Sequence, residues 1–263
     1  MTMTKEGEEK LACSLTAETT ELLPFLPYLL QDFWELGSDP DLMAQLIQKH
    51  VSLSAAARVL DLGCGKGAVS VKIAQRLSVP IKGIDLMPAF IEFAAEKARE
   101  FQVDDLCSFV VGDINEAVES EQGYDCVILG AVGDVLGSPA ETLHKLKQTV
   151  KPGGYILIDD GYLPEESKRE DIKYNSAVYL TEQQWMALFQ EAGLELVETA
   201  VPDDSSNLDS DSGMAAITGR ARELTEKYPD KKAMFEAYIR SQQNEYDDLD
   251  NSLVCVTWIL RKL

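Results

Sequence analysis

Several residue types that build specialised sites are scarce in this sequence. It has only two histidines, His50 and His144, which excludes a histidine-rich metal site. Its five cysteines are an odd number and form no C-x-x-C pair, so we expect neither a disulfide framework nor a zinc site. We therefore predict no metal, and we interpret the cysteines as small buried thiols.

Positive charge is also scarce. Lys and Arg total 24 against 45 Asp and Glu, which gives a formal net charge of −21. Affinity for nucleic acid depends mainly on cations that contact phosphates, and an anionic membrane surface attracts the same basic groups. No basic cluster compensates, since even Lys168 and Arg169 have acidic neighbours. The composition therefore disfavours nucleic acid and membranes as partners.

Long apolar runs are absent. No stretch approaches the roughly 20 apolar residues that a membrane-spanning helix needs. Residues 1–10 are polar and lack the apolar core of a signal peptide. We therefore expect a cytoplasmic protein. Its 263 residues, 45% of them apolar, suffice for one decorated domain or two small ones.

The sequence does contain a regular alternation of short apolar runs and helical patterns. Strands are expected at 58–62, 81–84, 108–111, 124–129, 155–158, 194–199 and 252–260. Helices are expected at 68–77, from Pro88 onward, from Ser138 onward and at 181–192. Strands that alternate with helices predict an α/β fold, with a parallel sheet covered by helices on both faces.

Three regions depart from this alternation. The first 50 residues are expected to form an N-terminal helical lid. Residues 202–212 are typical of a flexible loop, and 214–228 and 229–246 of two helices, all placed between the sixth and seventh strands. The predicted organisation is a lid at 1–50, a core at 51–201 and 251–263, and a helical cap insertion at 202–250.

The stretch from Val59 to Gly67 carries the strongest functional signal. A strand that ends in an acid, Asp61, is followed by three alternating glycines, after which a helix begins. Glycine permits positive φ and lets the backbone approach a ligand closely, and the helix N-terminus offers N–H groups. A tight turn alone needs fewer glycines, so the pattern predicts a ligand-binding loop.

Two classes of ligand fit this loop. Gly63, Gly65 and Ala68 satisfy the dinucleotide fingerprint, and Asp85 lies where a ribose-binding acid belongs. An NAD(P)-dependent oxidoreductase therefore stays open. Asp61 favours another class, because a carboxylate facing the loop would repel a pyrophosphate but suit an ammonium group.

Four segments, taken in order, resemble class I S-adenosylmethionine-dependent methyltransferases of the small-molecule type. They are Val59–Gly67, Gly83–Leu86 with Pro88 after it, Val111–Ile114, and Lys151–Gly154. The resemblance covers residues 58–200 and the last strand. It implies a Rossmann-like sheet of seven mostly parallel strands, whose last strand is antiparallel.

The resemblance also implies roles for single residues. Asp61 would bind the methionine amino group, directly or through water, and Asp85 would accept hydrogen bonds from both ribose hydroxyls. Asp113 would meet the adenine amino group, with Leu86 and Ile114 on either side of the ring. The glycines expected against the cofactor are Gly63, Gly65 and Gly130.

Methyl transfer from a sulfonium is an in-line displacement with a neutral leaving thioether, so the enzyme mainly aligns the nucleophile. A general base is needed only when the nucleophile carries a proton. Asp134, after the fourth strand, is the candidate base or substrate-orienting acid; a helix cap or a loop acid is its alternative role. The charge and the lid segments favour a small-molecule acceptor. A homo-oligomer and a non-catalytic methyltransferase-like binding domain stay open.

Overall fold

The computed structural model describes residues 4–52, 54, 56–167, 169–174, 179–202 and 210–263. At its centre lies a seven-stranded sheet with the order β3-β2-β1-β4-β5-β7-β6. The strands are β1 (Val59–Leu62), β2 (Ile81–Asp85), β3 (Cys107–Val111), β4 (Tyr124–Gly130), β5 (Val150–Tyr162), β6 (Leu194–Ala200) and β7 (Val254–Lys262). Strands β1 to β5 pair in parallel, and β7 is antiparallel to both β5 and β6. The predicted sheet is therefore confirmed.

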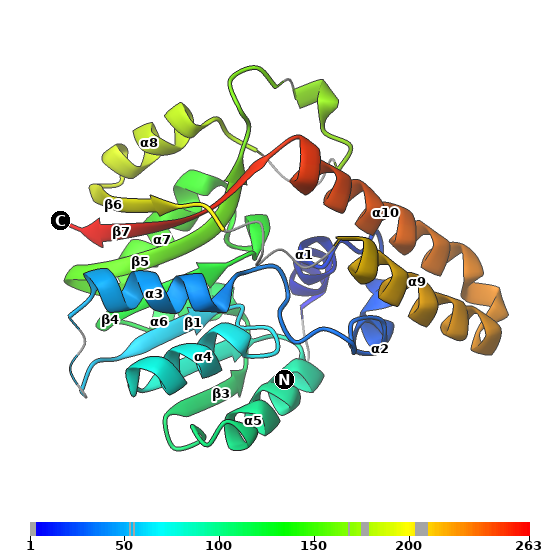
Figure 1. The fold of residues 1–263 in the computed structure, drawn as a ribbon, viewed down its shortest axis with the longest axis horizontal. Coiled ribbons are helices and arrows are strands. Elements are labelled where there is room, and N and C mark those ends of the chain that lie inside the picture. Colours follow the sequence, from blue (N-terminus) through cyan, green and yellow to red (C-terminus); the bar gives the residue numbers. More distant parts are fainter. Residues whose placement is uncertain (1–3, 53, 55, 168, 175–178, 203–209) are drawn as a thin grey trace.

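Helices cover both faces of the sheet (Figure 1). One face carries α3 (Pro40–His50), α4 (Ala68–Leu77) and α5 (Pro88–Glu100), and the other carries α6 (Ile114–Ser120), α7 (Pro139–Thr149) and α8 (Glu182–Glu191). Met43 and Ile73 pack against Ile128 on the first face. Leu143 and Trp185 belong to the core on the second face. Apolar burial on both sides explains why the strands read as continuous apolar runs.

Local sequence explains where several helices begin. Ser138 and Glu141 form a reciprocal capping box at the start of α7, and Thr181 and Gln184 form another at the start of α8. Pro88 occupies the first turn of α5, where its missing N–H costs nothing. These starts agree with the sequence predictions, because caps act within three or four residues of chain.

The structure differs from the sequence predictions at three places. The seven residues of α6 were not predicted as a helix, since so short a segment shows little periodicity. The strand expected at 155–158 begins earlier, because β5 includes Pro152–Gly154 and pairs Val150 with Tyr124 before its register shifts. Pro229 begins a 3₁₀ turn, η4 (Pro229–Lys231), and α10 starts only at Lys232.

Five other helical elements form a second body over the carboxyl edge of the sheet. They are α1 (Lys5–Ser14), η1 (Thr20–Phe25), α2 (Leu26–Leu29), α9 (Ser210–Lys227) and α10 (Lys232–Asn251). Their apolar residues share one core with Met87 and Phe90 at the start of α5. The Phe25 ring meets Tyr228 and Phe235 edge-on, with centroids 5.3 and 5.2 Å away. We call these five elements the cap.

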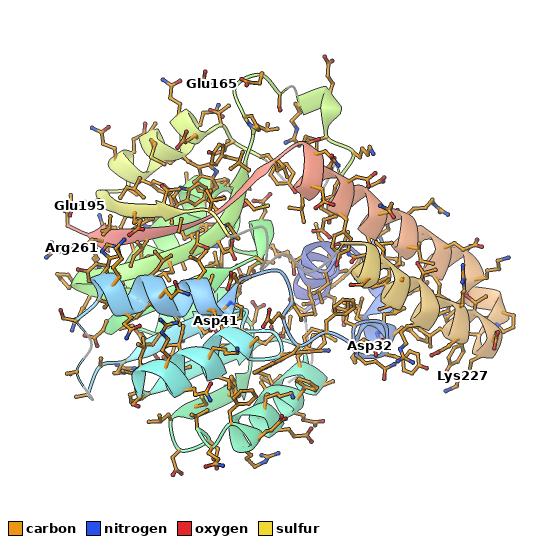
Figure 2. The ribbon with its side chains drawn as sticks, in the orientation of Figure 1. Asp32, Asp41, Glu165, Glu195, Lys227 and Arg261 are labelled. Atoms are coloured by element: carbon orange, nitrogen blue, oxygen red, sulfur yellow. The ribbon has the colours of Figure 1, made fainter. Side chains whose placement is uncertain are left out.

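The cap joins two regions that the sequence analysis kept apart, the N-terminal residues and the insertion. Figure 1 shows α1 and α2 between the sheet and the α9–α10 pair. Outside the shared core, Asp32 (labelled in Figure 2) accepts two hydrogen bonds from Arg220 of α9, at 2.7 and 2.8 Å. By contrast α3, placed in the predicted lid, packs on the sheet.

The loop predicted at 202–212 falls largely on residues 203–209, which lie outside the described residues. Within the part of the chain that is described, no helix combines the length and the apolar character needed to cross a lipid bilayer.

We predict that Phe235→Ala will loosen both halves of the cap together. Phe235 is fully buried, and loss of such a ring costs about 3–5 kcal/mol. Hydrogen–deuterium exchange should accelerate in α9, α10 and residues 20–30, while β1 and β4 stay protected. Glu236→Ala, on the exposed side of α10, is the matched control. Faster exchange confined to α10 would contradict a shared core.

Candidate functional site

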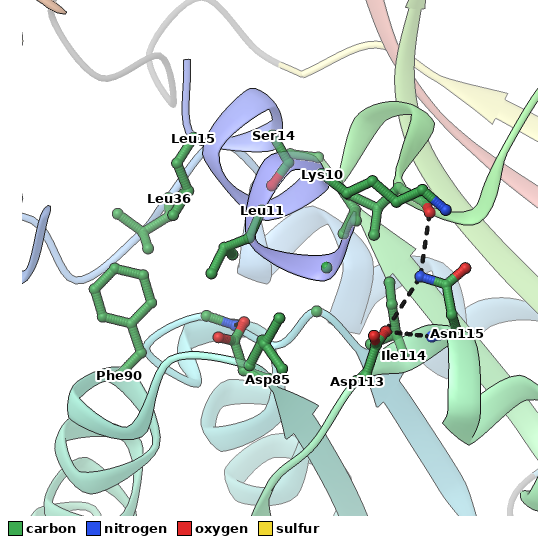
Figure 3. A pocket seen from close by; sticks show the side chains of 18 residues that line it. Lys10, Leu11, Ser14, Leu15, Leu36, Asp85, Phe90, Asp113, Ile114 and Asn115 are labelled. Atoms are coloured by element: carbon green, nitrogen blue, oxygen red, sulfur yellow. Dashed lines mark hydrogen bonds between the residues drawn. The ribbon is translucent and has the colours of Figure 1, made fainter. Parts of the chain in front are cut away.

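A cavity lies at the carboxyl ends of β1, β2 and β4, beneath α1 (Figure 3). The strand order reverses between β1 and β4, and open α/β sheets bind ligands at such a switch point. The cavity is lined by Gly7, Lys10, Leu11, Ser14, Leu15, Leu36, Gly63, Gly65, Asp85, Leu86, Phe90, Asp113, Ile114, Asn115, Gly130, Ala131, Val132 and Val135. Seven of the eight residues predicted for cofactor binding are in this set; Asp61 is not.

The glycine loop needs its glycines for two reasons. Gly63, Gly65 and Gly67 have φ of +71°, +50° and +76°, a region that other residues rarely adopt. A Cβ on Gly63 would also lie 2.7 Å from Val132, and one on Gly65 would lie 3.3 Å from Leu36. The loop therefore presents backbone atoms without side chains to the cavity, and a side chain at Gly63 or Gly65 would occupy part of the cavity.

Asp85, at the end of β2, holds the loop in place. Its Oδ2 accepts a hydrogen bond from the Gly65 N–H, and its Oδ1 accepts one from the Met87 N–H, both at 2.9 Å. Burial raises the pKa of Asp85, and these backbone donors oppose that shift. Since each carboxylate oxygen can accept more than one hydrogen bond, the two oxygens can still serve a ligand.

Asp113 is both a helix cap and a cavity residue. Its Oδ1 accepts from the Asn115 N–H at 2.8 Å and so caps α6. Its Oδ2 faces Gly7 of α1, where a Cβ would lie 3.4 Å away. Leu86 and Ile114 present apolar side chains to the same cavity. The structure thus places an acid and two apolar groups together, as a heteroaromatic ring with an amino group requires.

Asp61 lies behind the loop. It is 3% exposed, and its Oδ2 accepts a hydrogen bond of 2.6 Å from the Ser70 hydroxyl in α4. Burial raises its pKa to about 6. The carboxylate is therefore directed toward the start of α4, and the cavity lining does not include it.

Asp134 lies in η2 (Gly133–Leu136), beside the cavity but exposed. Its neighbours Val132 and Val135 line the cavity, whereas its charge acts on Asp160, at the end of β5. Gly130, at the end of β4, does line the cavity, and a Cβ there would lie 2.5 Å from the Ser38 hydroxyl.

Sequence reasoning assigned no role to Lys66, which lies within the glycine loop. Its ammonium is buried and donates to the carbonyls of Leu30 and Phe33, at 2.5 and 2.6 Å. The rings of Phe90 and Phe93 lie 5.7 and 5.0 Å from the same nitrogen. Burial lowers its pKa to about 8. Lys66 therefore ties the loop to the chain after α2.

The lining contributed by α1 was also missed. Gly7, Lys10, Leu11 and Ser14 come from a segment whose first half is polar in sequence. The four-residue spacing from Leu11 to Leu15 is the only signal that a helix there buries one side. Figure 3 shows Leu11 directed into the cavity from above, opposite Asp85.

The fold and the site together define a class I methyltransferase architecture. The dinucleotide fold has the strand order 3-2-1-4-5-6, whereas here the antiparallel β7 is inserted between β5 and β6. The oxidoreductase alternative therefore loses its structural support. A model of the methyltransferase domain family matches residues 53–193, and the chain belongs to that family.

Two curated relatives match this chain over different shares of its length. The uncharacterized protein YjhP of Escherichia coli K12 is 28% identical over 199 residues, which cover 73% of this chain and 77% of that protein. The malonyl-[acyl-carrier protein] O-methyltransferase of Acetivibrio thermocellus is 32% identical over 117 residues, 43% of this chain and 40% of that enzyme.

Solved structures share the fold. A methyltransferase of Geobacter sulfurreducens in complex with S-adenosyl-L-homocysteine superposes with a TM-score of 0.76 at 23% identity, over 91% of this chain and 98% of that one. The crystal structure of YjhP superposes with a TM-score of 0.72 at 22% identity, over 90% of this chain and all 100% of that one.

We predict that Asp85→Ala will lower the affinity for S-adenosylhomocysteine by about 100-fold or more. Hydrogen bonds to a charged group contribute about 1.5–3 kcal/mol each, and the substitution also releases the loop from Asp85. Calorimetric titration measures the change. Asp105→Ala removes the same charge from an exposed turn and serves as the control. Unchanged affinity would remove Asp85 from the site.

The raised pKa values of three buried or half-buried carboxyls predict how the free energy of unfolding depends on pH. Burial raises the pKa of Asp61 and Asp160 to about 6 and that of Asp159 to about 7. The folded state therefore binds more protons than the unfolded state between these values and the ordinary value of 3.8, so stability falls as pH rises through this window.

Urea unfolding should accordingly give a free energy at least about 2 kcal/mol larger at pH 5 than at pH 7.5, given about 1.4 kcal/mol per pKa unit. In Asp61→Asn the difference should shrink. A stability that stays constant or increases from pH 5 to pH 7.5 would contradict the burial of these carboxyls.

Proposed function

We propose that this chain transfers a methyl group from S-adenosylmethionine to a small molecule held between the sheet edge and the cap. One observation carries the proposal: the glycine loop, Asp85 and Asp113 come from three different strand ends and converge on one cavity. Each supplies what one part of the cofactor needs.

The lining fits the cofactor part by part. Asp85 would accept from the ribose hydroxyls with the lone pairs that the backbone leaves available. Asp113 would accept from the adenine amino group through Oδ2, with Leu86 and Ile114 against the ring. Gly63, Gly65 and Gly130 would lie along the methionine portion. Asp61 would act on the methionine amino group only through water or through the loop, because Ser70 engages its carboxylate.

When bound, the cofactor supplies a methyl group on a positively charged sulfur. The chain's own residues bind and orient it, exclude water and align the acceptor. Leu11 of α1 and Leu15, directly after α1, enclose the cavity on the side away from the sheet. Such positioning supplies about 7–11 kcal/mol in favourable cases, which suffices without a general acid because the leaving thioether is neutral.

The relatives support methyl transfer without fixing the acceptor. Two of them are named as a malonyl-[acyl-carrier protein] O-methyltransferase and a 27-O-demethylrifamycin SV methyltransferase. Their alignments cover about half of this chain or less, so the acceptor has to be inferred from this chain's own site. Asp134 stays a candidate for orienting that acceptor, and a cytoplasmic location and a homo-oligomer stay predictions of the sequence.

Calorimetry and thermal unfolding test the cofactor assignment. S-adenosylmethionine and S-adenosylhomocysteine should bind and raise the unfolding free energy, by about 2.7 kcal/mol at a ligand concentration 100 times Kd. NAD, the control ligand, should produce no shift. Stabilisation by NAD, or binding of neither sulfur nucleoside to folded protein, would reject the proposal. Binding without methyl transfer across amine, hydroxyl and carboxylic acid acceptors would favour a non-catalytic domain.

A further inference from the structure

A row of four residues crosses the carboxyl edge of the sheet next to the cofactor cavity. Gly130 of β4 pairs with Asp159 of β5, Asp159 pairs with Thr257 of β7, and Thr257 pairs with Ala200 of β6. We call these residues the edge row. Gly130 also lines the cavity. Asp159 is its partner on the neighbouring strand, and neighbouring strands lie about 4.8 Å apart.

Asp159 and Thr257 project from the same face of the sheet. Leu157 and Ile259, two residues away along their strands, both belong to the core beneath α3. Since side chains alternate along a strand, Asp159 and Thr257 point to this α3 face as well. Asp160 points to the opposite face, where Asp134 acts on its charge.

Two buried hydroxyl groups flank the Asp159 carboxyl. Thr257 is fully buried, and Ser38, in the segment before α3, covers the Gly130 end of the edge row. Ser38 lies close enough to lower the pKa of Asp159. Yet neither Ser38 Oγ nor Thr257 Oγ1 makes a hydrogen bond of regular geometry to any described residue. An unsatisfied buried hydroxyl such as that of Thr257 costs about 1–3 kcal/mol, so a polar group bound beside it would be stabilised by a new hydrogen bond.

Among the described residues, the charged groups that act on Asp159 are both negative. Asp160 on the same strand and Asp39 at the start of α3 both raise the pKa of Asp159, and burial contributes most to its value of about 7. Across the strand pair, Asp159 and Asp160 raise the pKa of the Cys255 thiol, after the larger effect of its burial. Among the described residues, no Lys or Arg forms an ion pair with Asp39, Asp159 or Asp160. Such a site favours a cation and repels a carboxylate.

We propose that the methyl acceptor is an amine, that Asp159 binds it as an ammonium ion and takes its proton, and that Ser38 and Thr257 position the carboxyl group. The inference rests on the proposed function. The proton passes from nitrogen to the Asp159 carboxylate, which frees the nitrogen lone pair. That pair forms the bond to the methyl carbon, and the electrons of the breaking carbon–sulfur bond stay on sulfur, leaving a neutral thioether.

Three probes that share one ring test the charge preference: benzylamine, benzyl alcohol and benzoate. Each is titrated by NMR into the full chain saturated with S-adenosylhomocysteine. Benzylamine should bind at least tenfold more tightly than the other two. Its affinity should rise about tenfold from pH 6 to pH 8, as Asp159 ionises around a pKa of about 7 while the amine stays charged. Equal or tighter binding of benzyl alcohol or benzoate would overturn the proposal.

Matched variants assign the effect to Asp159. Asp159→Asn should weaken benzylamine binding about tenfold or more and remove its pH dependence. Asp160→Asn makes the same change on the opposite face, so it should keep both the benzylamine affinity and its pH dependence. The midpoint of the pH dependence should move to lower pH, because a negative charge near Asp159 is lost. Ser38→Ala should raise the midpoint, since Ser38 lowers the pKa of Asp159. A merely structural Ser38 would leave the midpoint unchanged.

Affinity for S-adenosylhomocysteine separates the possible failures. If wild-type protein does not bind it, the proposed function fails. If wild-type protein binds it and discriminates none of the three probes, only the amine proposal fails. If Asp159→Asn folds but no longer binds S-adenosylhomocysteine, the Asp159 carboxylate binds the cofactor's own amino group, and the amine proposal is overturned. Should Asp159→Asn not fold, the probe series and the Ser38→Ala midpoint still decide.

Discussion

The ligand-binding half of this structure depends on one buried positive charge. The Lys66 ammonium is held by two main-chain carbonyls of the segment after α2, between aromatic rings of α5. Removing an ammonium ion from water costs several kcal/mol, which only such partners offset. A residue of the glycine loop is thereby fixed to the segment that leads to Leu36, which lines the cavity. The loop and this segment form one unit, because a shift of either would break the hydrogen bonds of the buried ammonium.

This coupling explains why the cap is assembled from the two sides of the sequence. Gly7, Lys10 and Leu11 of α1 line the cavity directly, and α9 and α10 share a buried core with α1, η1 and α2. The insertion between β6 and β7 therefore acts on the cofactor cavity through the N-terminal helices that it supports. It lies close to the strand ends that face an acceptor, because α10 leads directly into β7.

Much of the fold and part of the site could be predicted from sequence, for a common physical reason. Alternating elements, helix caps and the glycine loop are encoded within a few consecutive residues, so β1, α4 and α8 were placed almost to the residue. Gly63, Asp85 and Asp113 follow from strand ends, whose position topology determines. Lys66, Gly7 and Ser38 could not be assigned, because their contacts are made across long separations in sequence. Asp61 is an example: its strand was predicted, but its hydrogen bond from Ser70 depends on how α4 packs against the sheet, which the local sequence does not show.

The five cysteines differ in exposure, so an electrophile added to the folded protein should react mainly with one of them. Cys64 in the glycine loop and Cys126 in β4 are buried, and burial raises the pKa of both thiols. Cys107 and Cys255 are partly buried, with pKa values raised to about 12 and about 11, so they carry little thiolate at neutral pH. Cys13 alone is exposed, near the end of α1. A maleimide dye added to the native protein would therefore label Cys13 of α1, which lines the cavity. The dye would report on the movement of α1 without the introduction of a new cysteine.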